Sequence, residues 1–330
     1  MPFLLVKKRP KELCKKLVKL IDSLEERIAE DEESQIALQK TNEKVLEILA
    51  TMKTMIYGDE ENDPKMADVK RFRDELTDPN TKLFIFLLKK FHLLGITQQN
   101  ELTKIANFYL HRARQNNFVE YIMENQVVVD ILTEGISNDV SSTYYSSMTG
   151  ECIKHKDLAE LFLSPERLHR FFDYAGNVKT DLAMEGFKNL RLLLTVHKKI
   201  ISSFLKQNFD LIFKHNFSNL LKSENYFTVT KTLILLYDIL ISYENKQVLA
   251  KYMNELPLLI QIMELLRSKQ LNLQNSAYNI FKLFLGNDKK SEEIERVLYN
   301  NKTVLEDFLK RFENDGLIFL FLIFFDNFFR

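Results

Sequence analysis

The chain has 330 residues, of which 45% are hydrophobic and 28% are charged, and its 46 basic side chains are balanced by 46 acidic ones. This balance argues against a nucleic-acid-binding protein, because a phosphate backbone requires a basic partner surface. Only eight glycines and six prolines occur, which favours long helices and leaves no glycine-rich loop for phosphate.

The two cysteines, Cys14 and Cys152, are far apart in sequence and offer neither a disulfide framework nor a paired zinc motif. A reducing compartment is therefore expected. The first residues place an apolar run before a basic cluster, the reverse of a secretory signal peptide. No run reaches the roughly 18 apolar residues of a membrane-spanning helix. We expect a cytoplasmic protein that is not bound to a membrane.

The N-terminal region predicts a helical hairpin over residues 1–57. A helix opens at Pro10, and a second one is expected after an acidic turn at residues 30–34. The apolar residues at helical spacing are Leu13, Leu17, Leu20, Ile21, Leu24 and Ile28 in the first helix and Leu38, Val45, Leu46, Ile48, Leu49 and Met52 in the second. These two helices would cap whatever follows them.

Beyond the hairpin, the polar segment 58–64 is the clearest long loop, since it consists of turn formers with almost no apolar residue. Helical patterns then follow one another with short breaks and no period-two alternation, so β-structure is not expected. The breaks lie near Pro79, Gly95, Asn116, Asn138, Pro165, Asn177, Asn225, Pro257, Asn287 and Asn301.

Two sequence patterns that recur within the chain indicate the architecture. The pattern at residues 220–223 and 235–240 returns 45 residues later at 265–268 and 280–285, and His155-Lys156 returns 42 residues later as His197-Lys198. Periods in this range are typical of HEAT and armadillo arrays, in which small helical units stack into one continuous core. The sequence therefore predicts an all-α, armadillo/HEAT-like, right-handed helical-repeat solenoid of about seven repeats, and thus a binding scaffold.

Signals for chemistry are sparse. Cys152 and His155 have the spacing of half a zinc site, but no second pair follows at a suitable distance, and a buried cysteine beside a helix-end histidine explains them. No nucleophile motif, phosphate loop or kinase signature occurs. We therefore predict no catalytic residue, no metal and no cofactor, and keep a hydrolase or metal site at Cys152 and His155 as an alternative from a different class.

Two charged segments invite functional readings that we do not adopt. The cluster Lys7, Lys8, Arg9 and Lys11 could meet an anionic membrane or a nucleic acid, but a solvated helix start explains it. The acidic segment 59–63 lacks the ligand spacing and the closing Glu of an EF-hand, so no structural calcium is expected.

The 26 phenylalanines lie mostly at helical spacing among Leu and Ile, which is typical of a core and not of a base-stacking surface.

Several segments, in the same order, resemble the calcium-binding protein 39 family, also called the mouse-protein-25 scaffolds. The resemblance runs from Met1-Pro2-Phe3 to about residue 315. It includes residues 151–155 (ECIKH), 194–198 (LTVHK), 220–226 (LLKSENY), 265–268 (LLRS) and 272–282 (NLQNSAYNIFK). The resemblance implies a single armadillo-like domain over residues 1–315, with residues 1–57 as its N-terminal cap.

The same resemblance implies a function. Members of the family have no activity of their own and hold sterile-twenty-like protein kinases or pseudokinases in an active conformation, in signalling for polarity, morphogenesis or growth. A concave face supports the kinase fold, and a C-terminal pocket takes a Trp-Glu-Phe tail. Carried over, the partner-binding residues are Tyr226 on the ridge, Met263 in the pocket and Lys231 as the neighbouring cation.

Departures from the family fall in the same region. Thr230 occupies the position where the pocket arginine is expected, and Lys231, one residue later, is turned by about 100° on a helix. Tyr243 and Lys246 stand where the family has an arginine and a phenylalanine at the kinase contact. Because an arginine that forks onto a carboxylate is poorly replaced by threonine or lysine, a general armadillo-type adaptor without kinase activation remains the alternative.

The C-terminal end also departs from the family. Residues 317–325 are nine consecutive apolar residues, within an atypical tail of residues 316–330. Nine residues are too few to span a bilayer and form no amphipathic face. The interpretations considered are a mispredicted gene end, a buried terminal segment and a membrane-dipping tail.

Overall fold

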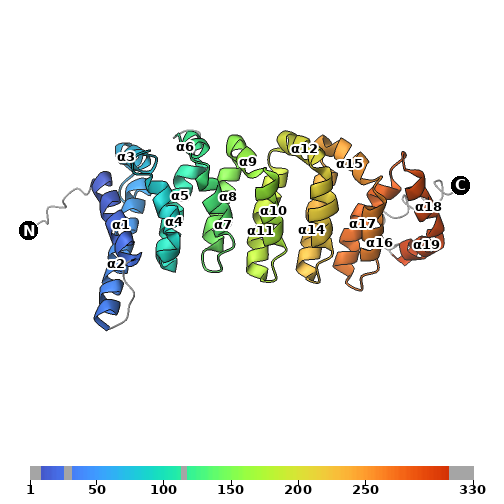
Figure 1. Ribbon diagram of the computed structural model, residues 1–330, viewed down its shortest axis with the longest axis horizontal. Helices are drawn as coiled ribbons and strands as arrows, with labels where there is room; N and C mark the ends of the chain where they lie inside the picture. The colour runs from blue at the N-terminus through green and yellow to red at the C-terminus, as the bar shows by residue number, and fades with distance from the viewer. Residues whose placement is uncertain (1–8, 26–31, 113–116, 312–330) are drawn as a thin grey trace, which may run out of the picture. The chain divides into compact units, whose positions relative to one another are not determined.

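The computed structural model describes residues 9–25, 32–112 and 117–311, and all regular secondary structure within these ranges is helical (Figure 1). The chain forms two compact units, Met1–His197 and Lys198–Arg330. The helices of the first unit are α1 (Pro10–Glu25), α2 (Glu32–Tyr57), α3 (Met66–Leu76), α4 (Leu83–Lys89), the 3₁₀-helix η1 (Phe91–Leu93), α5 (Ile96–His111), α6 (Phe118–Glu124), α7 (Val127–Gly135), α8 (Ser142–Ile153), α9 (Lys156–Phe162), α10 (Pro165–Ala175) and α11 (Thr180–Thr195).

The second unit has the same kind of element order. Its helices are α12 (Lys198–Gln207), the π-helix η3 (Asp210–Phe217), α13 (Ser218–Leu221), α14 (Tyr226–Leu240), the 3₁₀-helix η4 (Tyr243–Asn245), α15 (Lys246–Tyr252), α16 (Leu256–Leu265), α17 (Leu271–Leu285), α18 (Glu292–Asn300) and α19 (Lys302–Arg311).

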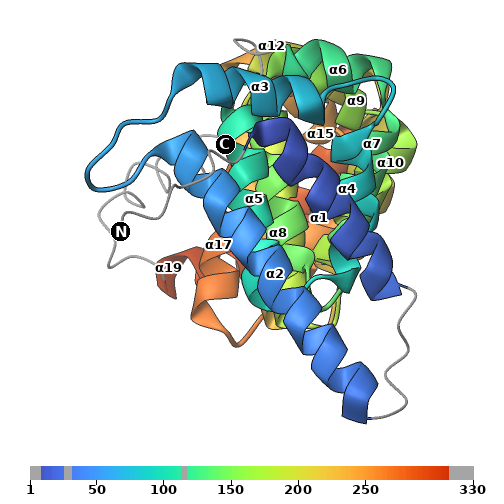
Figure 2. The same ribbon diagram turned by 90° about the vertical axis from the view of Figure 1, so that its left-hand side faces the viewer.

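Three-helix repeats account for most of these elements. The first unit contains α3–α5, α6–α8 and α9–α11 after the pair α1 and α2, and the second contains α12–α14 and α15–α17 before the pair α18 and α19. The third helix of each repeat packs on the third helix of the next, as α5, α8 and α11 do in the first unit and α14 and α17 in the second, and α2 packs on α5 in the same way. Figure 2 shows α2 in front of α5 and α8. The predicted all-α, armadillo-like helical-repeat fold is confirmed.

The predicted N-terminal hairpin is confirmed, with one correction. Pro10 is the first residue of α1, where its missing N–H leaves no hydrogen bond unmade. However, α2 already begins at Glu32, so the interpretation of residues 30–34 as a turn is wrong for its last three residues. Acidic residues are favourable in the first turn of a helix because they complement its dipole, and this preference outweighed their appearance as a loop. Ile28 lies outside the described residues.

The loop predicted at residues 58–64 is also confirmed. Gly58 has φ +85°, and Asp59 accepts hydrogen bonds at Oδ1 from the backbone N–H groups of Glu61 and Asn62 at 3.0 and 2.8 Å. The side-chain amide of Asn62 and the backbone N–H of Glu61 hold the pKa of Asp59 below its ordinary value. The carboxylate is thus used to close a turn.

Polar side chains connect equivalent helices of successive repeats, the third helices in the first unit and α13 with α16 in the second, at similar sequence separations. In the first unit, Asn107 of α5 donates to Ser147 of α8 at 2.9 Å, and Asn189 of α11 donates to Ser146 of α8 at 2.6 Å. In the second unit, the hydroxyl of Ser218 donates to the Gln261 side-chain oxygen at 2.7 Å, across 43 residues. Buried polar groups of this kind require partners, and here neighbouring repeats supply them.

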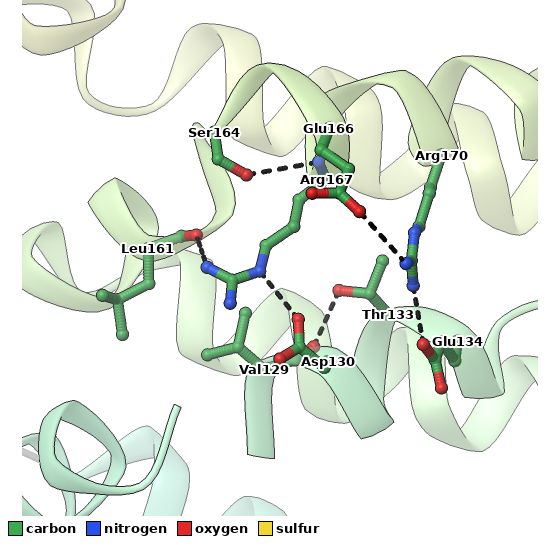
Figure 3. Close-up of polar contacts among 9 residues, drawn as sticks. All are labelled: Val129, Asp130, Thr133, Glu134, Leu161, Ser164, Glu166, Arg167 and Arg170. Atoms are coloured by element: carbon green, nitrogen blue, oxygen red, sulfur yellow. Dashed lines mark hydrogen bonds and ion pairs between the residues drawn. The ribbon is translucent and has the colours of Figure 1, made fainter. Parts of the chain in front are cut away.

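The second helices of neighbouring repeats are joined by arginine–carboxylate pairs (Figure 3). Arg167 of α10 donates from Nε to Asp130 of α7 at 2.8 Å and from Nη1 to the Leu161 carbonyl oxygen at 2.6 Å. One turn along, Arg170 donates to Glu134 at 2.8 Å. Because the Arg167 side chain is only 18% exposed, its pair with Asp130 is better shielded than an ordinary surface ion pair.

The sequence echo between residues 220 and 285 corresponds to equivalent helices. Leu235, Leu236, Ile239 and Leu240 are buried in α14, and Ile280, Phe281 and Phe284 occupy the same face of α17. These helices pack on each other, as do α13 and α16 before them. The repeated apolar pattern therefore marks one face used in two successive repeats, as predicted.

Within the described ranges, no helix is both long and apolar enough to cross a membrane. In the same ranges, no group of three or more His, Cys, Asp or Glu side chains is placed to hold a metal ion. Lys7, Lys8 and the tail at residues 316–330 lie outside the described residues.

Candidate partner-binding site

Tyr226 is the first residue of α14 and is 37% exposed. The helix starts here because the side chain of Asn225 caps it, accepting a hydrogen bond from the Phe227 N–H at 2.9 Å. Tyr226 lines a shallow cavity of about 350 Å³ between the start of α14 and the end of α16, together with Leu221, Val229 and Leu273 among others. An exposed aromatic ring at the mouth of a cavity suits contact with a partner protein.

Met263 lies on α16 and is half-buried. It lines a second, larger cavity of about 730 Å³, whose other apolar lining residues are Ile260, Leu266, Val297, Val304, Leu305 and Phe308. The cavity is bounded by α16, the start of α17, and the pair α18 and α19. Its volume is in the range of pockets that enclose a small ligand or a few side chains.

The two cavities share one wall. Glu264, Arg267 and Ser268, at the end of α16 and in the turn after it, line both of them. Arg267 is exposed, and among the described residues it forms no ion pair. Its guanidinium is therefore available to a ligand in either cavity, where it can bind a carboxylate through two hydrogen bonds.

Lys231 does not belong to this arrangement. It lies on the exposed side of α14, lines neither of the two cavities, and its Nζ lies 5.6 Å from the centre of the Phe227 ring. Thr230 is half-buried, and its Oγ1 has no hydrogen-bond partner among the residues that the structure describes. The structure thus brings Tyr226 and Met263 to adjacent cavities and leaves Lys231 outside them.

Arg267, which lines both cavities, is not among the partner-binding residues expected from the sequence. The echo at residues 265–268 included it, but only as a sign of the repeat. Its relevance comes from the position after α16, where the turn into α17 carries it past both cavities. No spacing within one helix predicts such a placement.

A second exposed aromatic residue lies at η4. Tyr243 is 75% exposed, and the Nζ of Lys246 lies 3.7 Å from the centre of its ring. Stacking of a cation on a tyrosine face is attractive, so the two residues act as a pair and not as separate replacements for an arginine and a phenylalanine. Next to them, a backbone N–H and the Ser242 hydroxyl hold the pKa of Glu244 below its ordinary value.

The alternative site at Cys152 and His155 is not supported by the geometry. Burial raises the pKa of the Cys152 thiol, and this side chain has no exposed surface. The Nε2 of His155 lies 2.7 Å from the carbonyl oxygen of Leu110. Since a carbonyl oxygen only accepts, Nε2 carries the proton and is not free to bind a metal.

The sequence is similar to a known protein family over almost its whole length. The model of the family described as Mo25-like matches residues 3–317. A human protein named calcium-binding protein 39-like is 30% identical over 298 residues, covering 90% of this chain and 88% of the relative. A MO25-like protein of Arabidopsis thaliana is 32% identical over 260 residues, covering 76% and 73%. Protein HYM1 of Saccharomyces cerevisiae is 25% identical, covering 84% and 72%.

Among solved structures, a designed armadillo repeat protein in complex with a (KR)4 peptide aligns with 81% of this chain and 99% of its own, at 11% identity and a TM-score of 0.43. The assignment to a family does not depend on this likeness, since it follows from the sequence match over almost the whole chain. The resemblance noted from Met1 to about residue 315 is thereby confirmed, and the chain belongs to the Mo25-like family.

Proposed function

We propose that this protein is a non-catalytic cytoplasmic scaffold that binds a sterile-twenty-like protein kinase or pseudokinase and stabilises its active conformation. Membership of the Mo25-like family and the stacked helical repeats support a scaffold. A scaffold activates a kinase without chemistry of its own if it binds the active conformation more tightly than the inactive one.

The observation that carries the proposal is the pair of adjacent cavities at the end of α16. Tyr226 opens one, Met263 lines the other, and Arg267 stands in the wall between them. The larger cavity offers apolar surface and a cation, which are what a tail with aromatic and acidic residues, such as Trp-Glu-Phe, would require. Interfaces of this kind obtain most of their affinity from a few aromatic and arginine contacts.

The experiment begins with capture of partners from native extract by the full chain, followed by mass spectrometry. We expect a kinase or pseudokinase of the sterile-twenty-like group, and recovery of neither would count strongly against the proposal. The recovered kinase is then assayed with and without the scaffold. Acceleration of substrate phosphorylation that is lost with Tyr226→Ala, but kept with the exposed control Tyr299→Ala on α18, is the expected result.

The second candidate is a general armadillo-type adaptor that binds peptides without activating a kinase. The substitution of the family's pocket arginine by Thr230 favours it, because this side chain cannot fork onto a carboxylate. Binding of a fluorescein-labelled Trp-Glu-Phe peptide separates the two candidates. Saturable binding to the wild type that is weakened by Met263→Ala supports tail docking. No measurable binding to the wild type or to the variant supports the general adaptor.

A further inference from the structure

Apolar surface is left open at the larger cavity by the described part of the chain. Ile260 of α16 is 42% exposed and Val304 of α19 is 66% exposed, and they line the cavity together with the half-buried Met263. Exposed apolar side chains that line a concave surface mark a place where another segment binds.

The chain itself continues from the wall of this cavity. Val304, Leu305 and Phe308 line it from α19, which ends at Arg311. Five residues, 312–316, separate the end of α19 from the nine apolar residues 317–325. Five or six residues of chain reach about 20 Å when extended, which is ample for a return to a cavity that the preceding helix lines.

The sequence between the helix and the apolar segment suits a reversal of direction. Asn314-Asp315-Gly316 consists of turn formers, with glycine last. Asp315 and Asp326 flank the uncharged segment, and the cavity lining carries two cations, Arg267 and Lys269, and two carboxylates, Glu264 and Asp307. Exposed to water, nine apolar residues in a row would favour aggregation, whereas burial in a cavity of the same chain removes that hazard.

We propose that the chain's own residues 317–325 fold back and occupy the cavity lined by Met263 and Val304. The cavity of about 730 Å³ holds a few of these side chains and not all nine. Such a segment is tethered beside its site, so its effective concentration is on the order of mM for a short linker. Weak intrinsic affinity is then sufficient for occupancy.

A regulatory consequence follows, which rests on the proposed function. If a partner's tail docks at Met263, the chain's own segment competes with it, and the scaffold is self-inhibited. A partner must then displace residues 317–325 before it can bind, which lowers its apparent affinity by the fraction of open molecules.

Disulfide trapping tests the occupancy directly. The two native thiols of the chain are buried, Cys14 at 2% exposure and Cys152 at 0%, so they do not compete with engineered cysteines for oxidation. Val304→Cys is combined in turn with Phe319→Cys, Phe321→Cys and Ile323→Cys in the full chain. Under mild oxidation we expect an intramolecular disulfide in at least one pair, seen as faster migration on a non-reducing gel and confirmed by mass spectrometry.

The matched control places the first cysteine at Met184, which is 53% exposed on α11 and not in the cavity. Val304 pairs should crosslink about ten-fold more than Met184 pairs, as expected for a segment held at an effective concentration far above its average in solution. Equal yields would overturn the proposal. Disulfides only between molecules, rising with protein concentration, would also overturn it and would assign the segment to a second copy.

A second measurement keeps the two proposals separate. A chain ending at Asp315 should bind the labelled Trp-Glu-Phe peptide about ten-fold more tightly than the full chain, as expected when the competitor fills most of the sites. Crosslinking without any peptide binding supports the occupied cavity and contradicts tail docking. Equal peptide affinity of the two chains together with equal crosslinking at Val304 and Met184 contradicts self-occupancy alone.

Discussion

The Nε2 of His197 lies 2.8 Å from the backbone carbonyl oxygen of Ile153, near the end of α8 in the preceding repeat. The same contact occurs one repeat earlier, where His155 reaches the carbonyl oxygen of Leu110 near the end of α5 at 2.7 Å. The last carbonyl groups of a helix have no partner within it. Each histidine therefore supplies one from the turn that follows the third helix of the next repeat.

Replacing these histidines should destabilise the first unit. We expect His155→Ala and His197→Ala each to lower the free energy of unfolding by about 1–2 kcal/mol, since each leaves a partly buried carbonyl group unpaired. Urea denaturation followed by circular dichroism measures the effect. The control is His169→Ala, whose side chain is 56% exposed and lies 3.7 Å from Asp173, a surface pair worth less than about 1 kcal/mol. Equal losses in all three variants would contradict the role of the contact.

Two helical glycines differ in the space around them. A Cβ at Gly186 of α11 would lie 2.5 Å from the Ala175 backbone N and 2.6 Å from the Tyr174 carbonyl carbon, whereas at Gly150 of α8 its nearest neighbour would be a Leu192 methyl group at 3.4 Å. Gly186→Ala should cost about 2 kcal/mol or more, because the backbone of α10 must move. Gly150→Ala should be neutral or stabilise by up to about 1 kcal/mol. Thermal unfolding of the two variants distinguishes them, and similar melting temperatures would refute the close approach.

Glu101 should make stability depend on pH. Its Oε2 lies 2.5 Å from the Nζ of Lys53, and its Oε1 lies 2.9 Å from the Nζ of Lys104. Burial raises the pKa of Glu101, but the two lysines outweigh it and hold that pKa below its ordinary value of 4.5. The pairing thus stabilises the fold above pH 4.5, and this contribution is lost as the pH falls through the lower pKa of the folded state.

The corresponding measurement compares the wild type with Glu101→Gln between pH 7 and pH 3.5. The variant should be less stable by about 1–2 kcal/mol at neutral pH, and the gap should narrow on acidification. Glu160→Gln, at an exposed position on α9, is the control for removing a surface carboxylate. A gap that stays constant with pH would mean that Glu101 contributes by packing alone.

The position of Arg267 in the wall between the two cavities predicts that it contributes more to ligand binding than Lys231 does. Arg267→Ala should weaken binding of an acidic aromatic peptide about ten-fold or more, because a charge-assisted hydrogen bond contributes about 1.5–3 kcal/mol. Lys231→Ala should change it by less than about two-fold, since that side chain lines neither cavity and an exposed cation contributes little. Fluorescence anisotropy measures both. The reverse order would restore the assignment of Lys231 to the site.

Much of the fold could be predicted because it depends on local patterns. Apolar residues at helical spacing identified α1 and α14, and the 42- and 45-residue spacing of the recurring patterns predicted the helical-repeat architecture. The errors have local causes too: Glu32 was assigned to a turn, although acidic residues are favourable where α2 begins. The π-helix η3 at Asp210–Phe217 has no sequence signal of its own, because its five-residue hydrogen bonds depend on packing.

The site was less predictable than the fold. Tyr226 and Met263 came from positions matched to a family, and both line cavities. Lys231 was expected at the site only because it follows Thr230 in the sequence, but adjacent residues on a helix point in different directions. In the structure, the Lys231 ammonium group lies near the Phe227 ring. Arg267 depended on the path of a turn between helices, which one sequence does not specify.

The spacing of the contacts between repeats has a consequence for how the chain acquires its structure. Hydrogen bonds between neighbouring repeats, such as those from Asn107 to Ser147 and from Ser218 to Gln261, span 40 and 43 residues. Forming these bonds does not require closure of a very long loop. Folding rates rise as the separation of contacting residues falls relative to chain length. The early repeats can therefore form on the ribosome while the later ones are still being synthesised.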